Sequence, residues 1–232
     1  MNMALIEIEI TEQELLDAIA HARQHSHVDN LRSRNIYVSF DNKIRGFLGE
    51  VGVLKHLTSN GISARKSGMI ESNSTDIDLE YSNAFDQLLK IEVKTSLIPD
   101  YDGSLQNVIR ERDIKIIKRE STIESLSYDF TIQTYFNWKR KERDTFLKTL
   151  SGNPLDKTDE ELLDSMRLRE LEHTFVSWID KKSLVEYLND LGYGNQIWWI
   201  RGFRMHFWKA PITGVGKDPS DIAEFMRTYR SD

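Results

Sequence analysis

The sequence predicts a mixed α/β protein of the α+β type, in which helices flank a mixed central β-sheet. Segments that alternate apolar and polar residues, as a strand does, are interspersed with segments that carry apolar residues at helical spacing. The 232 residues are 39% hydrophobic and 10% aromatic, which is enough to fill one core. We therefore expect one domain over residues 1–232, with a core at about 40–136, a helical insertion at about 138–171 and an elaboration over 172–232.

The composition excludes several classes of protein. The absence of cysteine rules out disulfides, thiolate metal sites and cysteine nucleophiles. No apolar run approaches the ~18 residues that a membrane span needs, and the amino-terminal alternation is unlike a signal peptide, so we expect a cytoplasmic protein with no membrane partner. The net charge of −6, from 31 basic and 37 acidic residues, argues against a passive nucleic-acid coat. It leaves room for an enzyme that gathers carboxylates around a metal.

The amino-terminal quarter predicts a strand and two helices. Residues Ala4–Ile10 alternate as a strand does, and a Thr11–Glu14 capping box then opens a helix that continues to about Arg23. A second helix is expected after the apolar stretch Ile36–Phe40. Its predicted N-cap is Asp41 or Asn42, and its stop signal is Asn60-Gly61.

Strands follow this helix. Three are predicted in succession, at Ile62–Ile70, Asp76–Tyr81 and Leu88–Thr95, and a fourth at Tyr128–Tyr135. Residues 104–120, between the third and the fourth, are expected to form a helix or an irregular basic segment.

The last hundred residues begin with the charge-dense, helix-prone insertion and then return to core material. The predicted elements are a strand at Thr174–Ile179, a helix at Lys181–Leu191, an aromatic strand pair around Ile197–Trp208 and a short final helix.

The third predicted strand carries the residues that point to chemistry. Side chains alternate along a strand, so Glu92 and Lys94 project from one face, and Asp76, Asp78 and Glu80 share a face of the preceding strand. If the two strands pair as a hairpin, their carboxylates converge. Two or three such oxygens form the hard site that Mg²⁺ prefers.

A lysine beside a divalent cation and an acidic pair suits phosphodiester hydrolysis. The cation neutralises charge on the phosphate and lowers the pKa of a water molecule, while the ammonium holds or helps to deprotonate that nucleophile. The alternative for Glu92 and Lys94 is an ordinary ion pair on the sheet surface.

The spacing of an acidic residue two positions before a lysine is weak evidence alone. It recurs at Asp41/Lys43, Asp113/Lys115 and Asp180/Lys182, where the acids are predicted to cap helices or to lie in a basic segment. Only the Glu92/Lys94 pair has an apolar strand around it and an acidic strand just upstream.

The second helix adds a carboxylate. Glu50 flanks the apolar stripe of this helix, and Gly46, Gly49 and Gly52 each lower helix stability by ~1 kcal/mol relative to alanine. Glycines retained at that cost indicate close approach of a sheet or of a substrate backbone. Glu50 is therefore placed to reach a neighbouring metal site.

With these residues, the sequence resembles the PD-(D/E)xK nuclease superfamily, which has the restriction-endonuclease-like fold. The resemblance rests on Gly49-Glu50, Asp76 and Glu92-Val93-Lys94, and it covers about Lys43 to Tyr135 in the order helix, three strands, helix, strand. It implies Mg²⁺-dependent cleavage of DNA, with Mn²⁺ as a substitute. It also implies Asp76, Glu92 and Glu50 as metal ligands and Lys94 as the residue that orients the water.

Two points of this match stay open. Thr75, not proline, precedes Asp76, which departs from the family pattern. Asp76 is favoured over Asp78 as the ligand because it lies nearer the strand start, but the residues do not decide between them. Gln133, on the fourth strand, resembles polar residues that support such sites in the family.

Basic residues expected near a phosphate backbone follow the core elements. The first group is Arg110, Arg112, Lys115 and Lys118, with Arg119, and the second is Lys139, Arg140, Lys141 and Arg143. A solvated charged helix explains both groups at least as well. His21 and His25 lie one helical turn apart, but no third ligand is indicated, so an exposed helix end explains them better than a metal pair.

The expected function is that of a Mg²⁺-dependent deoxyribonuclease of the restriction or defence type, with DNA as its partner and a homodimer as one arrangement that cuts both strands. The alternatives are a structure-specific repair or recombination nuclease, and a catalytically inactive nucleic-acid-binding module of the same fold.

Overall fold

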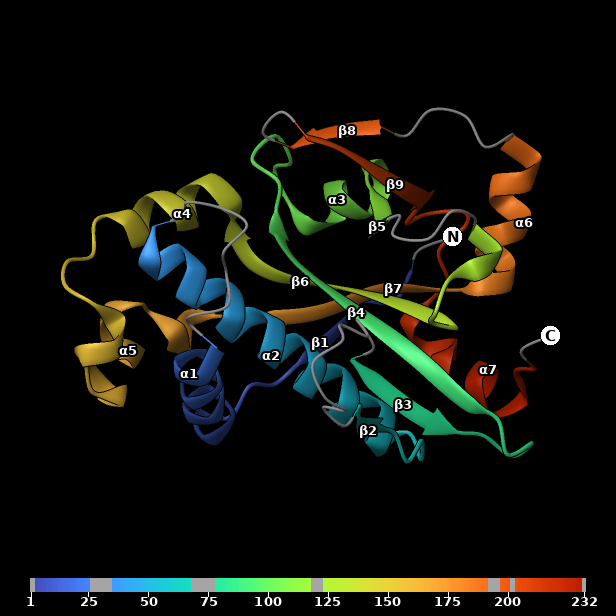
Figure 1. The fold of residues 1–232 in the computed structure, drawn as a ribbon, viewed down its shortest axis with the longest axis horizontal. Helices are drawn as coiled ribbons and strands as arrows, with labels where there is room; N and C mark the ends of the chain where they lie inside the picture. The colour runs from blue at the N-terminus through green and yellow to red at the C-terminus, as the bar shows by residue number, and fades with distance from the viewer. Residues whose placement is uncertain are drawn as a thin grey trace.

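The computed structural model describes residues 3–25, 35–67, 78–117, 123–191, 197–200 and 203–230. Its centre is a mixed six-stranded sheet (Figure 1). The strand order is β1 (Ile6–Ile8), β7 (His173–Asp180), β6 (Phe130–Lys139), β4 (Leu88–Ile98), β3 (Leu79–Ser82) and β2 (Arg65–Lys66). Neighbours are antiparallel except β4 and β6, which run parallel. The predicted mixed α/β class is confirmed.

Helix α2 (Ile36–Ser59) crosses one face of this sheet and contributes buried residues to two apolar clusters. Around its first half pack α1 (Glu12–His25), α4 (Arg140–Lys148) and α5 (Asp159–Ser165), which share one apolar cluster with it. Its second half shares a second cluster with the sheet and with α7 (Ile222–Thr228).

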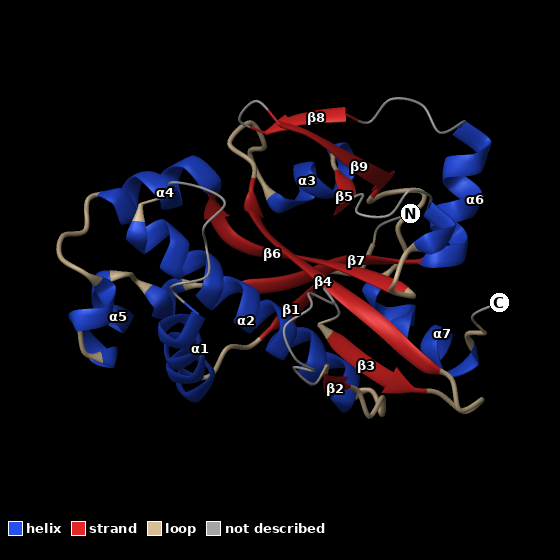
Figure 2. Cartoon of the chain, in the orientation of Figure 1, coloured by secondary structure: helices blue, strands red, loops and turns tan. Residues whose placement is uncertain are grey.

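A small second sheet lies beside the central one, as Figure 2 shows. Its strands are β5 (Asp113–Ile117), β9 (Phe203–Pro211) and β8 (Ile197–Ile200), in that order. Together with α3 (Leu105–Glu111) and α6 (Lys181–Leu191), this sheet covers an apolar cluster that includes Ile98 of β4 and Val176 of β7. Short 3₁₀ turns occur at Ile123–Ser125, Pro154–Asp156, Leu168–Glu170 and Pro219–Asp221.

Several local predictions are confirmed. The capping box forms, since the Thr11 backbone N–H donates to Glu14 and the Glu14 backbone N–H donates to the Thr11 hydroxyl. Helix α6 has the predicted bounds, and α2 ends at Ser59 with Asn60 as its C-cap. The segment 138–171 contains the helices α4 and α5, and the aromatic strand pair forms as β8 and β9.

The predicted start of α2 is wrong. The helix begins at Ile36, because Asn35 is its N-cap and accepts hydrogen bonds from the backbone of Tyr37 and Val38. Asp41 lies inside the helix, 1% exposed, between Arg45 and Arg143. A buried carboxylate paired with two guanidinium groups cannot be distinguished from a cap by local sequence, because Arg143 comes from a distant element.

The prediction for residues 104–120 missed a strand. Helix α3 ends at Glu111, and β5 follows at Asp113–Ile117, paired with β9. Ile114 and Ile116 are fully buried by this pairing. The partner strand lies about ninety residues away, so the local pattern alone favoured an irregular segment.

In the described residues, the strands predicted at 62–70 and 76–81 correspond to β2 and β3. Residues 68–77 lie outside the described residues. Among the described helices, none has the length and apolar character needed to cross a membrane.

Candidate metal and catalytic site

The site is built on β4, the strand between β3 and β6. Leu97 packs in the same apolar cluster as Leu48 of α2, and Thr95 lies against Gly49 of α2. Odd-numbered residues of β4 therefore face α2, and Glu92 and Lys94 project from the opposite face. The antiparallel β3–β4 pairing predicted from the sequence is confirmed, with Leu79 opposite Ile91.

Glu92 is a buried carboxylate with one unused oxygen. It is only 4% exposed, so the ion pair with Lys94 that the sequence offered as the alternative does form, but with the Glu92 carboxylate buried and not at the sheet surface. Its Oε1 accepts a hydrogen bond from Lys94 Nζ, whose side chain is 24% exposed. Its Oε2 is buried and has no hydrogen-bond partner among the described residues. Such an orphaned oxygen is costly in a protein interior, and coordination of a cation would offset that cost.

Asp78 directly precedes β3, and its side chain lies against β4. Its backbone N–H donates to Ile91 O over 3.1 Å, and its Oδ2 accepts from the Val93 backbone N–H over 2.6 Å. Its side chain therefore takes the place of a strand carbonyl at the edge between β3 and β4. Burial is the largest cause that raises the pKa of Asp78, and the charges of Glu50 and Glu92 add to it, while the Val93 hydrogen bond and Lys94 oppose the rise; the net result is a pKa of about 7.

Glu50 approaches Asp78 from α2. Burial raises the pKa of Glu50, and the ammonium of Lys66, 3.6 Å from Glu50 Oε2, acts in the opposite direction. Lys66 comes from β2 and was not singled out from the sequence. Its only signal in the sequence is a position within the strand predicted at Ile62–Ile70.

The donor chemistry fits a hard divalent cation, but no complete ligand set is formed in advance. Glu50, Asp78 and Glu92 supply the carboxylate oxygens that Mg²⁺ prefers. Within the described ranges, no group of three or more His, Cys, Asp or Glu side chains is placed to hold a metal ion. Glu50 and Glu92 are each engaged by a lysine, and Asp78 by a backbone N–H. Asp76 lies outside the described residues, so its predicted role stays a prediction.

Gln133 lies next to the site in a supporting position. It is paired with Lys94 across the parallel β4–β6 ladder and is 3% exposed. Its Nε2 donates to Lys94 O over 3.1 Å and to Thr134 O over 2.9 Å. These bonds fix the backbone that carries Lys94.

The basic residues expected to contact DNA lie in several different surroundings. Arg110 pairs with Glu111 on the surface of α3, and Arg112 makes two hydrogen bonds to Asp102. Lys115 lies in β5, but its side chain is not described, and Lys118 is outside the described residues. Arg143 of the second basic group is fully buried against Asp41, so the expectation that it borders a DNA site is wrong.

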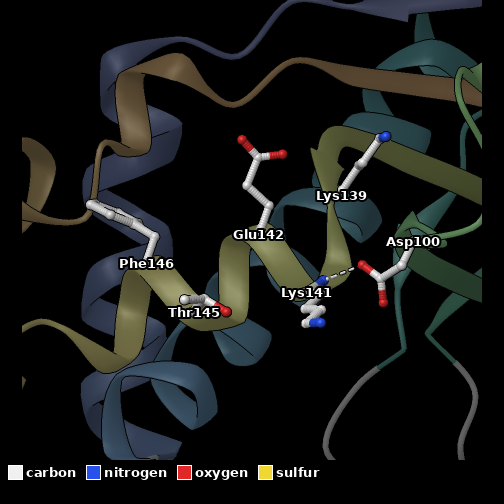
Figure 3. A pocket seen from close by; sticks show the side chains of 6 residues that line it. All are labelled: Asp100, Lys139, Lys141, Glu142, Thr145 and Phe146. Carbon is white, nitrogen blue, oxygen red and sulfur yellow. Dashed lines mark hydrogen bonds between the residues drawn. The ribbon is translucent and has the colours of Figure 1, made fainter.

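A shallow open cavity lies away from Glu92, where β4 and β6 end. It has a volume of about 570 Å³ and is lined by Asp100, Lys139, Lys141, Glu142, Thr145 and Phe146 (Figure 3). The Lys141 backbone N–H donates to Asp100 over 2.6 Å at its rim. None of the predicted metal ligands lines the cavity, so it is separate from the site on β4.

Comparison with known proteins adds no neighbour: no family model matches the chain, and no curated protein or solved structure is significantly similar to it.

Proposed function

We propose that this protein is a Mg²⁺-dependent deoxyribonuclease with a restriction-endonuclease-like core, acting as a restriction or defence endonuclease. The observation that carries the proposal is Glu92, a buried carboxylate that contacts Lys94 through one oxygen and whose other oxygen has no hydrogen-bond partner in the part of the chain that the structure describes. Asp78 on the neighbouring strand and Glu50 on α2 complete the acidic surroundings.

The order of elements supports the same proposal. Helix α2 is followed by the antiparallel strands β2, β3 and β4, then by α3 and β5, and then by β6, which is parallel to β4. Apart from β5, which belongs to the second sheet, this is the order that the resemblance implies. Glu92 lies on the third of these strands, and Asp78 directly precedes the second.

The chain's own residues have distinct roles in this proposal. Glu92 and Asp78 would hold Mg²⁺, with Glu50 as a further ligand, and Asp76 remains the alternative to Asp78. The bound ion would supply positive charge that stabilises the phosphate in the transition state. Lys94, partly exposed and anchored by Glu92, orients the attacking water and, in its neutral amine form, accepts the proton that the water gives up. Gln133 keeps the strand that carries Lys94 in place.

The proposal predicts a specific loss on changing Lys94. Purified protein should cleave plasmid DNA with Mg²⁺ or Mn²⁺ and not with EDTA. Lys94→Ala should lower the cleavage rate by roughly 10²–10⁴-fold, because the nucleophile loses its general base. Lys90→Ala is the matched control, since Lys90 lies on the same strand and the same face and should leave cleavage unchanged.

The pattern of products separates the related functions. Discrete fragments support the restriction or defence role, and a preference for branched or flapped DNA supports a repair or recombination nuclease. The proposal would be contradicted if cleavage continued in EDTA. It would also be contradicted if Lys94→Ala and Lys90→Ala lowered the cleavage rate equally. DNA binding without cleavage of any substrate, with either metal, would favour an inactive binding module. Size-exclusion chromatography with light scattering tests the homodimer that double-strand cutting implies.

A further inference from the structure

Two of the three glycines that interrupt α2 are explained by the fold, and the third is not. A Cβ at Gly49 would collide with Thr95 of β4, and one at Gly52 would lie 2.6 Å from the ring of His173 on β7. Close approach of the sheet therefore requires both. A Cβ at Gly46 would meet no described heavy atom within 4 Å. Gly46 thus weakens the helix without any packing reason among the described residues.

Gly46 lies in a half-exposed stripe of α2 that leads to the candidate site. Lys43, Gly46, Phe47 and Glu50 follow one another at helical spacing, so they share one face. Glu50 is the acidic end of this stripe and lies 3.6 Å from Lys66 Nζ. The stripe is therefore continuous with the carboxylates around Asp78.

Cationic and aromatic groups from three elements gather on this stripe. Lys66 Nζ of β2 lies 3.7 Å from the centre of the Phe47 ring. The His21 ring of α1 lies 4.9 Å from Phe47 and stacks on His25 at 4.2 Å. The charge of Lys43 of α2 also acts on the His21 ring. The surface formed by His21, Lys43, Gly46, Phe47 and Lys66 is called the Gly46 surface below.

The Gly46 surface carries two ammonium groups, those of Lys43 and Lys66, and Glu50 lies 3.6 Å from Lys66 Nζ. Burial is the largest cause that lowers the pKa of His21, and His25, Lys66 and Lys43 lower it further, to about 4 in all, so the His21 ring adds an aromatic face and no charge at pH 7. An anionic ligand would complement the two ammonium groups, and the ring of Phe47 offers an apolar contact beside it.

We propose that the Gly46 surface binds the phosphodiester backbone of a DNA strand, with a phosphate over Gly46 between Lys43 and Lys66 and a sugar or base against Phe47. The missing side chain at Gly46 lets the strand approach the helix backbone. This inference rests on the proposed nuclease function, because it places the substrate strand on the path that ends at Glu50.

Binding can be measured without cleavage. The probe is a fluorescent DNA oligonucleotide, titrated with full-length protein in EDTA and followed by anisotropy at several salt concentrations. Gly46→Ala should raise the melting temperature by roughly 2–4 °C, because alanine favours the helix. The same change should weaken DNA binding about tenfold, because the methyl group fills the space of the phosphate.

Lys43→Gln tests the charge of the surface. It should weaken binding by roughly 3- to 10-fold and lower the salt slope by about one counterion, as expected for loss of one phosphate contact. Lys148→Gln, at an exposed position on α4, is the matched control and should bind as the unaltered protein does.

The outcomes separate this inference from the proposed function. If the unaltered protein cleaves and binds DNA, and both Gly46→Ala and Lys43→Gln bind equally well, the Gly46 surface has no role in binding and only this inference fails. If the protein binds DNA with the expected losses but cleaves none, the surface stands and the nuclease proposal fails. If it does not bind DNA, both are overturned.

Discussion

At the scale of single residues, the protein keeps carboxylates in places where their charge is costly. Asp78 is the clearest case, since burial and the charges of Glu50 and Glu92 all oppose its ionisation. Natural proteins retain such strain mainly where function requires it. The carboxylates therefore have a reason to be there that stability does not provide.

Asp78→Asn should accordingly stabilise the metal-free protein while removing its activity. The folded-state pKa of Asp78 is raised from 3.8 to about 7, so its contribution to stability is full below about pH 4 and is lost as the pH rises through 7. Asparagine still accepts the Val93 bond but carries no charge. The variant should gain roughly 2–4 kcal/mol in the free energy of unfolding at pH 8 and little at pH 4.

Denaturant unfolding at the two pH values measures this gain, and plasmid cleavage measures the activity. Asp76→Asn serves as the comparison: if it abolishes cleavage while Asp78→Asn remains active, then Asp76 is the ligand, as the sequence favoured. A gain that is equal at both pH values would show that charge is not its cause.

At the scale of elements, the contact between α2 and the sheet positions the site. Gly49 and Gly52 let α2 lie directly against β4 and β7, and this close packing brings Glu50 to Lys66 of β2, beside the start of β3. The sequence indicated that these glycines mark a close approach. It did not indicate which strands approach, because strand pairing is not a local property.

Gly49→Ala should push α2 away from β4. The added methyl group would overlap the Thr95 side chain, and overpacking of this kind costs about 1–3 kcal/mol of unfolding free energy. Thr95→Ala should recover part of the loss when the two changes are combined, which a double-mutant cycle in urea would measure. Strictly additive losses would mean that the two side chains do not meet.

At the scale of the whole molecule, one buried ion network ties the helices after β6 to the core. Asp41 of α2 accepts hydrogen bonds from Arg45 over 2.7 Å and from Arg143 of α4 over 2.6 Å. Burial opposes ionisation, but the two guanidinium groups hold the pKa of Asp41 below its usual value. The network therefore fixes the predicted insertion on the same helix that carries Glu50.

Removing the charge of Asp41 should loosen this attachment. Asp41→Asn should lower the free energy of unfolding by about 3–5 kcal/mol, because it leaves buried guanidinium groups without a counterion. Asp41→Leu combined with Arg143→Met should be less damaging than Asp41→Asn, since no charge is then stranded between α2 and α4. Chemical denaturation measures the free energy of unfolding of both variants. If Asp41→Asn left it unchanged, the role of the network would be refuted.

Local patterns predicted what local physics controls. The Thr11–Glu14 capping box, the bounds of α6 and the alternation that puts Glu92 and Lys94 on one face all follow from backbone hydrogen bonding and side-chain periodicity. They required no knowledge of the rest of the chain. The start of α2 was predicted wrongly because Asp41 resembles a cap, whereas the cap is Asn35 and Asp41 lies inside the helix, paired with Arg143 about a hundred residues away.

By itself, the sequence determined the mixed α/β class and that Glu92 and Lys94 share one face of a strand. Only the tertiary structure decided that Glu92 is buried with one oxygen that has no hydrogen-bond partner among the described residues, that Lys66 meets Glu50, and that a Cβ at Gly46 would meet no described heavy atom within 4 Å. The physical reason is that burial and electrostatic environment depend on residues far apart in the chain. Periodicity fixes only the direction in which a side chain points.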